Sequence, residues 1–202
     1  MAWSVPDPAA WVSPEAMPKS GLGELTGVMK ESAGALREAD VPFLLGGGIA
    51  CWARGGPETD HDVDLLVMPQ DADRALETLT AQGMRPERPP EGWLYKAWED
   101  GCFVDLIFET SAGPVTKDYF DRGEQLEVHA VRMSVASLED VLVCKLLTLN
   151  EQSLDFRSAL EIARALREKI DWTAVRERTA HSPHARAFFV LLEELGVIDP
   201  PR

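Results

Sequence analysis

The feature that most constrains this chain is a run of three glycines between two short apolar segments, the second of which begins with paired acids. Glycines 46–48 follow the apolar run 43–45, and the run 62–67 opens with Asp62-Val-Asp64. Successive side chains of a strand point to opposite faces, so Asp62 and Asp64 share one face of the strand predicted here. Two carboxylates beside a sheet core repel each other and lose hydration. A divalent cation bound between them would relieve both costs.

Two further features extend this site. Glycines at the start of a helix leave backbone N–H groups uncovered, so a phosphate can approach them closely. A third acid, Asp105, stands alone in the strongly β-prone run 102–108. Beside Asp62 and Asp64 it would complete a cage of carboxylates able to hold two Mg²⁺ ions about 3.5–4 Å apart. The combination predicts chemistry on a nucleoside triphosphate.

The order of these elements resembles the DNA-polymerase-β-like nucleotidyltransferase superfamily. Within it, the chain is most similar to small bacterial members, namely toxin-type nucleotidyltransferases of the AbiEii and MenT kinds and antibiotic-modifying nucleotidyltransferases. The resemblance covers residues 22–149 and departs from the usual pattern at Ile49, where a small hydroxyl residue is common. It implies that the phosphate-binding glycines are Gly47 and Gly48, and that the metal ligands are Asp62, Asp64 and Asp105.

The resemblance also implies the architecture and the reaction. We expect an α+β protein with the α/β nucleotidyltransferase fold, in which helices flank a mixed β-sheet. The expected parts are an irregular N-terminal arm (1–20), a catalytic domain (21–135) and a C-terminal helical subdomain (136–202) that closes one wall of the cleft. The expected reaction transfers NMP from an NTP, such as ATP, to an acceptor hydroxyl and releases pyrophosphate. Mg²⁺ or Mn²⁺ would be the cofactor, and Asp105 could also help take the proton.

Two basic residues are candidates for contact with the triphosphate. Lys145 lies about 20° from Leu138 on a helical wheel, within an apolar stripe of residues 138–149. It is either a structural lysine or a phosphate-binding catalytic lysine, and the resemblance favours the second role. Arg54, next to Gly55, could bind the nucleotide or remain an ordinary loop arginine.

Charge restricts the acceptor without identifying it. The chain has a formal net charge of −14, and residues 1–150 hold 12 basic and 25 acidic residues, a balance of −13. Such a surface repels long polyanions and favours a cationic acceptor. Three hypotheses remain open, and the resemblance favours the first of them. The first is a toxin-type enzyme acting on an RNA 3′ end or a protein hydroxyl, with a possible antitoxin partner. The second is adenylylation of a small cationic compound such as an aminoglycoside, and the third is a non-catalytic nucleotide-binding module.

The remaining patterns predict the secondary structure and the setting. We expect a hairpin of residues 93–98 and 102–108, a loop at 85–92, a polar connection at 110–125 and one last strand at 126–135. Helices are expected at 22–39, 70–82, 137–150, 155–169, 172–179 and 183–195. No apolar run is long enough for a bilayer, and three cysteines without a C-x-x-C spacing indicate the reduced thiols of a cytoplasmic protein.

Several polar and aromatic residues have a structural interpretation that we prefer to a functional one. Asp60 is expected in a turn and His61 at a strand edge, and Asp155 is expected to cap a helix rather than to act as a catalytic acid. Trp93 and Trp98 are expected to pack in the hairpin rather than to stack on a base. Three histidines are expected to be ordinary surface or interface groups, namely His129, His181 and His184.

Overall fold

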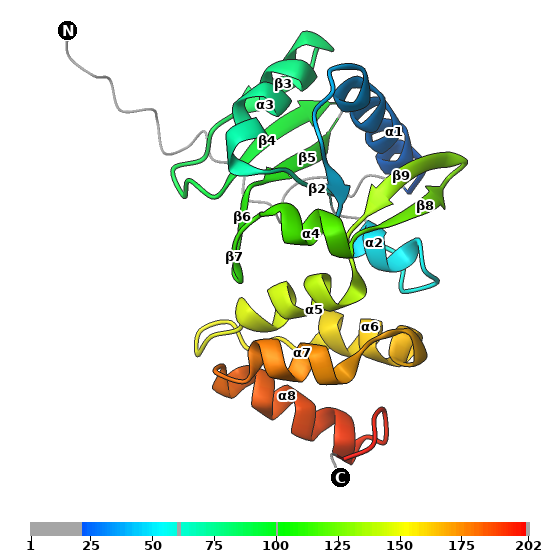
Figure 1. Cartoon of the computed structure of the whole chain (residues 1–202), viewed down its shortest axis with the longest axis vertical. Coiled ribbons are helices and arrows are strands. Elements are labelled where there is room, and N and C mark those ends of the chain that lie inside the picture. Colours follow the sequence, from blue (N-terminus) through cyan, green and yellow to red (C-terminus); the bar gives the residue numbers. More distant parts are fainter. Residues whose placement is uncertain (1–21, 60–61, 100, 201–202) are drawn as a thin grey trace, which may run out of the picture.

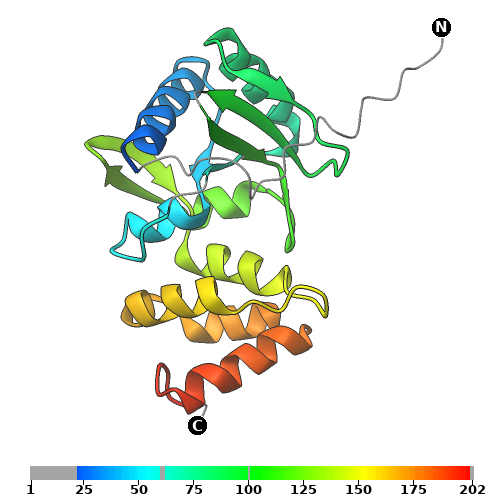
Figure 2. The same cartoon turned by 180° about the vertical axis from the view of Figure 1, so that it is seen from behind.

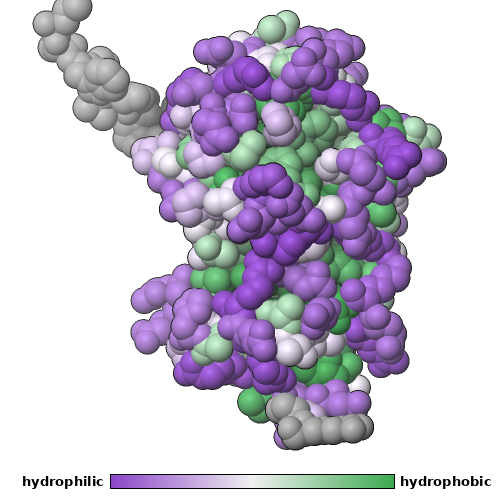
Figure 3. Space-filling model, in the orientation of Figure 1, coloured by the Kyte–Doolittle hydropathy of each residue, from purple (hydrophilic) through white to green (hydrophobic). Residues whose placement is uncertain are grey.

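The computed structural model describes residues 22–59, 62–99 and 101–200. The expected N-terminal arm (1–20) and the expectations for Asp60 and His61 therefore lie outside the described residues. Within the described ranges, no helix is both long enough and apolar enough to cross a membrane. Hydrophilic residues cover most of the face seen in Figure 3, and hydrophobic residues appear there as scattered patches.

A seven-stranded mixed sheet forms the centre of the larger part of the molecule (Figure 1). The β2–β5 and β1–β9 pairs are parallel and the other pairs are antiparallel, as predicted for a mixed sheet. In spatial order the strands are β3 (Arg85–Glu87), β4 (Leu94–Glu99), β5 (Cys102–Ile107), β2 (Val63–Leu66), β1 (Leu44–Leu45), β9 (Val131–Val135) and β8 (Glu124–Val128).

The two faces of the sheet differ in character. Helices α1 (Leu22–Glu38) and α3 (Ala72–Ala81, preceded by the 3₁₀ turn η3, Pro69–Asp71) pack against the central strands, as Figure 2 shows from behind. Val63, Leu65, Val104 and Leu106 are completely buried in the core that these elements share. Because side chains alternate along a strand, the residues between them, which include both Asp64 and Asp105, point to the opposite face.

Short elements and a group of helices complete the fold. The helices after the last strand, residues 138–194, stack below the sheet in Figure 1, and the first of them (138–147) packs against the short helix 47–52. The division into domains at residue 135 stays a prediction. The short elements are α2 (Gly47–Trp52), β6 (Glu109–Thr110), β7 (Gly113–Pro114) and α4 (Lys117–Arg122), and the stacked elements are α5 (Leu138–Leu147), α6 (Arg157–Leu166), η4 (Arg167–Lys169), α7 (Trp172–Thr179) and α8 (Pro183–Glu194).

The structure corrects three expectations about the sheet and its connections. Residues 85–87 form an edge strand rather than a loop, because Pro86 lies on an edge where the missing N–H is tolerated. The stretch 110–125 contains the hairpin β6–β7 and helix α4. Residues 126–135 contain parts of two strands, β8 and β9, because the chain reverses at His129 and Ala130, whose φ angles are 47° and 63°.

Candidate active site

Three acids meet on the face of the sheet opposite α1 and α3. Asp64 on β2 lies directly beside Asp105 on β5 in the parallel register, and Asp62 comes just before β2. Each of the three offers an oxygen that lies within 4.8 Å of the others. The structure therefore brings together the acids that the sequence singled out. Their role as metal ligands stays a prediction.

The local charges are unevenly balanced. The pKa of Asp64 is raised to about 8, mainly by burial and also by the negative charges of Asp62 and Asp105, while Lys145 and Lys96 act in the opposite direction. Burial also raises the pKa of Asp105, against the hydrogen bond from Lys96, which lowers it. When all three are ionised, the carboxylates carry one negative charge more than the two neighbouring ammonium groups neutralise, and the raised pKa of Asp64 reflects the cost of that state without a bound cation.

The carboxylate set suits a hard divalent cation. Carboxylate oxygens are the ligands that Mg²⁺ and Mn²⁺ prefer. A positive ion among the three acids would also remove the repulsion that raises the pKa of Asp64. The residues present therefore fit the metal that the resemblance implies.

The glycine turn lies against the second acid. The Gly46 amide donates to the Asp64 carbonyl at 2.8 Å. Gly47 has φ +54°, and a Cβ atom built on it would lie 1.6 Å from the Asp64 Oδ2 atom. A Cβ on Gly48 would lie 2.6 Å from the Thr59 hydroxyl oxygen. Glycine is thus required at both positions for steric reasons, whether or not their amides contact a phosphate.

The two predicted basic residues lie in different surroundings. Lys145 on α5 is close enough to Asp64 to lower the pKa of that carboxyl, and among the described residues its ammonium has no hydrogen bond or ion pair. Arg54 instead donates to the Ala50 carbonyl at 2.8 Å and to Glu124 at 3.4 Å. Contact of either residue with a nucleotide stays a prediction, and Arg54 would first have to leave these partners.

Lys96 is a residue of the site that our sequence reasoning missed. Its ammonium donates to Asp105 Oδ1 at 2.7 Å and to Oδ2 at 2.9 Å. Glu99 pairs with Cys102, and the same antiparallel register places Lys96 opposite Asp105. The predicted hairpin left three residues, 99–101, between its strands, which would place Lys96 opposite Val104 instead. Asp-Gly also favours a two-residue turn, and that choice would have given the observed register.

A second buried acid was also missed. Asp140 at the start of α5 is 1% exposed. It accepts hydrogen bonds from the Nε and Nη2 atoms of Arg122, from Nη2 of Arg178 and from the Ser137 hydroxyl. These contacts connect α4, α5 and α7. The set of residues 122, 137, 140 and 178 is called the Asp140 cluster below.

Other candidates occupy structural positions. Asp155 is exposed and accepts from the Arg157 amide at 2.9 Å, but the N-cap residue of α6 is Phe156, so Asp155 lies one residue before the cap position expected for it. The Trp98 ring packs against Phe103 across the β4–β5 hairpin, as expected, and its indole donates to Glu87 on β3 at 2.9 Å. Trp93 is 42% exposed.

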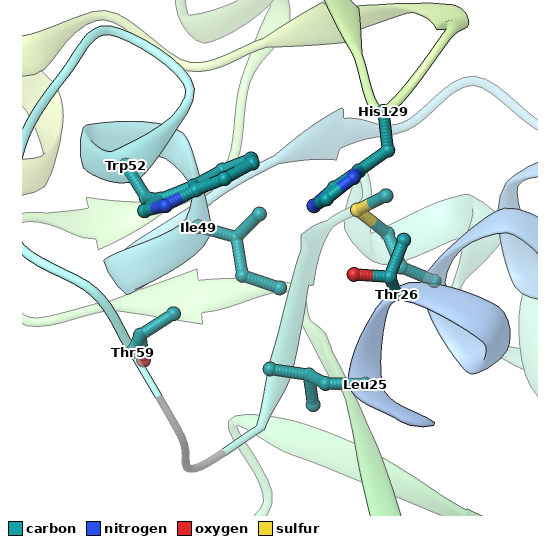
Figure 4. Close-up of a pocket in the computed structure, with 7 residues that line it drawn as sticks. Leu25, Thr26, Ile49, Trp52, Thr59 and His129 are labelled. Carbon is teal, nitrogen blue, oxygen red and sulfur yellow. The ribbon is translucent and has the colours of Figure 1, made fainter. Parts of the chain in front are cut away.

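A small pocket beside α2 corrects the expectation for His129. The imidazole is stacked on Trp52, with ring centroids 4.6 Å apart, and is only partly exposed (Figure 4). The pocket also contacts Ile49 and Thr59, and its volume of about 10 Å³ leaves room for about one water molecule. Within the described residues, His129 Nε2 is buried without a hydrogen-bond partner. This pocket is too small for a nucleotide.

Solved structures share this fold at low sequence identity. A crystal structure of ANT(2″)-Ia in complex with adenylyl-2″-tobramycin has a TM-score of 0.61 and 14% identity, over 82% of this chain and 99% of that one. A solution structure of the antibiotic-resistance factor ANT(2″)-Ia has a TM-score of 0.57 and 15% identity, over 85% and 96% of the two chains. A putative nucleotidyltransferase from Thermotoga maritima has a TM-score of 0.51 and 18% identity, over 73% and 92%.

Sequence comparison identifies the family. No curated protein sequence matches the chain. A family model described as "uncharacterised nucleotidyltransferase" matches residues 25–193, which include the glycine turn, the three acids and most of the helical part. The membership agrees with the predicted resemblance to polymerase-β-like nucleotidyltransferases, while a closer relation to the AbiEii or MenT toxins stays a prediction. The chain is therefore a nucleotidyltransferase and belongs to this uncharacterised nucleotidyltransferase family.

Proposed function

We propose that this protein transfers NMP from an NTP to a hydroxyl group of a small cationic acceptor. The single observation that carries the proposal is the convergence of Asp62, Asp64 and Asp105, whose oxygens lie within 4.8 Å of one another beside a glycine turn. A non-catalytic nucleotide-binding module would be favoured if Asp105 were turned away from the other two acids. The observed convergence and the family membership both argue against that alternative.

The three carboxylates are the proposed ligands of Mg²⁺ or Mn²⁺. When bound, such an ion polarises phosphoryl oxygens and offsets the charge that develops during phosphoryl transfer. The support for this assignment is electrostatic, because the acids outnumber the ammonium groups that face them. A divalent cation supplies the positive charge that the protein itself lacks at this place.

The other groups of the site would bind and orient the reactants. Lys145, whose ammonium has no hydrogen bond or ion pair within the described residues, would donate to a phosphate oxygen of the NTP. The Gly47 and Gly48 amides would face another phosphate oxygen. Asp105 would accept the proton of the acceptor hydroxyl. The acceptor oxygen then forms a bond to the α-phosphorus while the bond from that phosphorus to pyrophosphate breaks.

Charge supports a cationic acceptor. Residues 1–150, which contain all three acids, have a balance of −13, so a polyanion is repelled and a cation is attracted. The protein shares its fold with ANT(2″)-Ia, which has been solved with adenylyl-2″-tobramycin. An RNA 3′ end or a protein hydroxyl as acceptor, and an antitoxin partner, remain predictions of the toxin-type hypothesis.

Label transfer tests both the reaction and the acceptor. The protein is incubated with each α-³²P-labelled NTP and Mg²⁺ or Mn²⁺, in separate reactions with an aminoglycoside panel, total RNA and cell protein. We expect label in a cationic small molecule with the wild type and none with Asp64→Asn. Asp121→Asn is the matched control, because Asp121 is exposed and its ion-pair partner in the structure is Lys117.

Two outcomes would overturn parts of the proposal. Transfer that survives Asp64→Asn would contradict the role of the carboxylates. Label found only in RNA or protein would contradict the small cationic acceptor and support the toxin-type hypothesis, while leaving the carboxylate site intact.

A further inference from the structure

We infer that Lys96 is a built-in counter-cation at Asp105 that weakens divalent-cation binding until a nucleotide is present. The inference rests on the proposed function, because it concerns the same three acids. Both oxygens of Asp105 accept from the Lys96 ammonium, at 2.7 and 2.9 Å. A divalent cation that reaches Asp105 must therefore share these oxygens with the ammonium or displace it.

The backbone holds the lysine in this place. Lys96 pairs with Asp105 across β4 and β5, and Asp105 pairs with Asp64 across β5 and β2, so the three residues form one row on neighbouring strands. The Lys96 side chain also passes near the Phe103 ring, with 5.4 Å between Nζ and the ring centroid. The Asp105 side chain is only 8% exposed and that of Lys96 28% exposed. The contact is thus a built part of the sheet rather than a mobile surface ion pair.

Formal charges explain how the lysine would tune the site. With all three carboxylates ionised, as binding of a divalent cation through them requires, they and Lys145 together carry a net charge of −2, which a single divalent cation would neutralise. Lys96 reduces this charge to −1, so a divalent cation on its own makes the site positive. An NTP adds about four negative charges and restores the demand for cations. The ammonium has three donors on a flexible stem, so it can turn from Asp105 to phosphate oxygens. Lys96 is thus a positioning residue that couples metal binding to nucleotide binding.

Removal of the ammonium tests this coupling directly. Mn²⁺ binding to the full chain is measured at one fixed pH by the loss of the free-ion electron paramagnetic resonance signal. The titration is made without nucleotide and with a non-hydrolysable NTP analogue. We expect Lys96→Met to bind Mn²⁺ at least ~10-fold more tightly than the wild type without nucleotide. With the analogue present, we expect the difference to fall below ~3-fold.

Three variants control the measurement. Lys117→Met removes one exposed lysine of an ion pair elsewhere and should bind Mn²⁺ like the wild type. Lys96→Arg keeps the charge and should keep the weak binding. If Lys96→Met does not fold, Lys96→Gln takes its place, because it also removes the charge and the same Mn²⁺ affinities are expected for it.

The result separates this inference from the proposed function. Mn²⁺ affinity that is unchanged or weaker in the neutral Lys96 variants would overturn the inference, as would a tenfold difference that persists with the analogue. Neither result bears on the proposed role of the carboxylates, because the Asp64→Asn transfer assay tests that role without depending on Lys96.

Discussion

Two groups of acidic side chains in this protein differ in how their charge is neutralised. Asp140 is one carboxylate that receives hydrogen bonds from two guanidinium groups and a hydroxyl. At the sheet, three carboxylates face two lysines, and only Lys96 makes hydrogen bonds to one of them. A buried acid whose charge is fully compensated stabilises the packing of helices. A group of acids that keeps excess negative charge costs stability and is suited to binding a cation.

The largest expected effect is on activity at the sheet. Asp64→Asn should lower NMP transfer at least ~10³-fold, about 4 kcal/mol in activation free energy, because the central acid of the row loses its charge. Circular dichroism should show an intact fold, and label transfer measures the loss. If the acids at the sheet instead stabilise the fold as Asp140 does, this variant will unfold the protein.

The next effect is on stability at the Asp140 cluster. Asp140→Asn leaves Arg122 and Arg178 without their shared carboxylate and should lower the free energy of unfolding by about 3 kcal/mol. Asp105→Asn should cost much less, because the lost ion pair with Lys96 is offset by weaker repulsion with Asp64. Urea denaturation of both variants measures the difference. Equal losses in the free energy of unfolding would show that the acids at the sheet and Asp140 stabilise the fold to the same extent, which would contradict this account.

A third prediction concerns the glycine turn. Gly47→Ala would place a Cβ 1.6 Å from the Asp64 carboxylate and must displace it, so we expect a ~10²-fold loss of transfer, about 2.7 kcal/mol. Gly55→Ala is the matched control, because Gly55 also has a positive φ (+88°) but no atom within 4 Å of the added Cβ. It should cost about 1–2 kcal/mol of stability and leave transfer unchanged. Equal activity losses would show that backbone strain, rather than the clash with Asp64, is responsible.

The last prediction concerns the dependence of thermal stability on pH. The pKa of Asp64 is about 8 in the folded chain, against 3.8 as its ordinary value, so between these pH values the folded state binds more protons than the unfolded state. Stability due to Asp64 should therefore fall as the pH rises from about 4 to 8. The difference in Tm between Asp64→Asn and wild type, measured by scanning calorimetry without metal, should grow steadily over this range. Mg²⁺ added at pH 8 should reduce this difference in Tm. A difference in Tm that stays constant from pH 4 to 8 would contradict the charge repulsion among the three acids.

The predictable parts of the site are those that depend on local pattern. Asp-x-Asp at the start of a strand and a lone acid in a β-prone run were sufficient to select Asp62, Asp64 and Asp105, which the fold brings together. Helices with clear caps were also predictable, such as α8, which Ser182 caps before Pro183. The hairpin was predictable, but its register was wrong by one residue, because the predicted turn of three residues would place Lys96 opposite Val104 rather than Asp105.

The parts that could not be predicted depend on distant contacts or on unusual backbone conformations. The turn at His129 and Ala130 has two positive φ angles without a glycine, so no residue type marks it. Asp140 looks like an ordinary first-turn acid of a helix, and only the approach of Arg122 and Arg178 from other elements shows its role. Arg54 follows a short helix beside glycines, but its contacts with Ala50 and Glu124 arise from the fold.

The most direct test of the central claim is a crystal structure of the protein with Mn²⁺ and a non-hydrolysable NTP analogue. The anomalous signal of manganese identifies the ion without assumptions about its ligands. We expect manganese at about 2.1–2.2 Å from oxygens of Asp62, Asp64 and Asp105, with the triphosphate beside Gly47. Manganese bound elsewhere, with the three acids free of metal and Lys96 still on both oxygens of Asp105, would contradict this account.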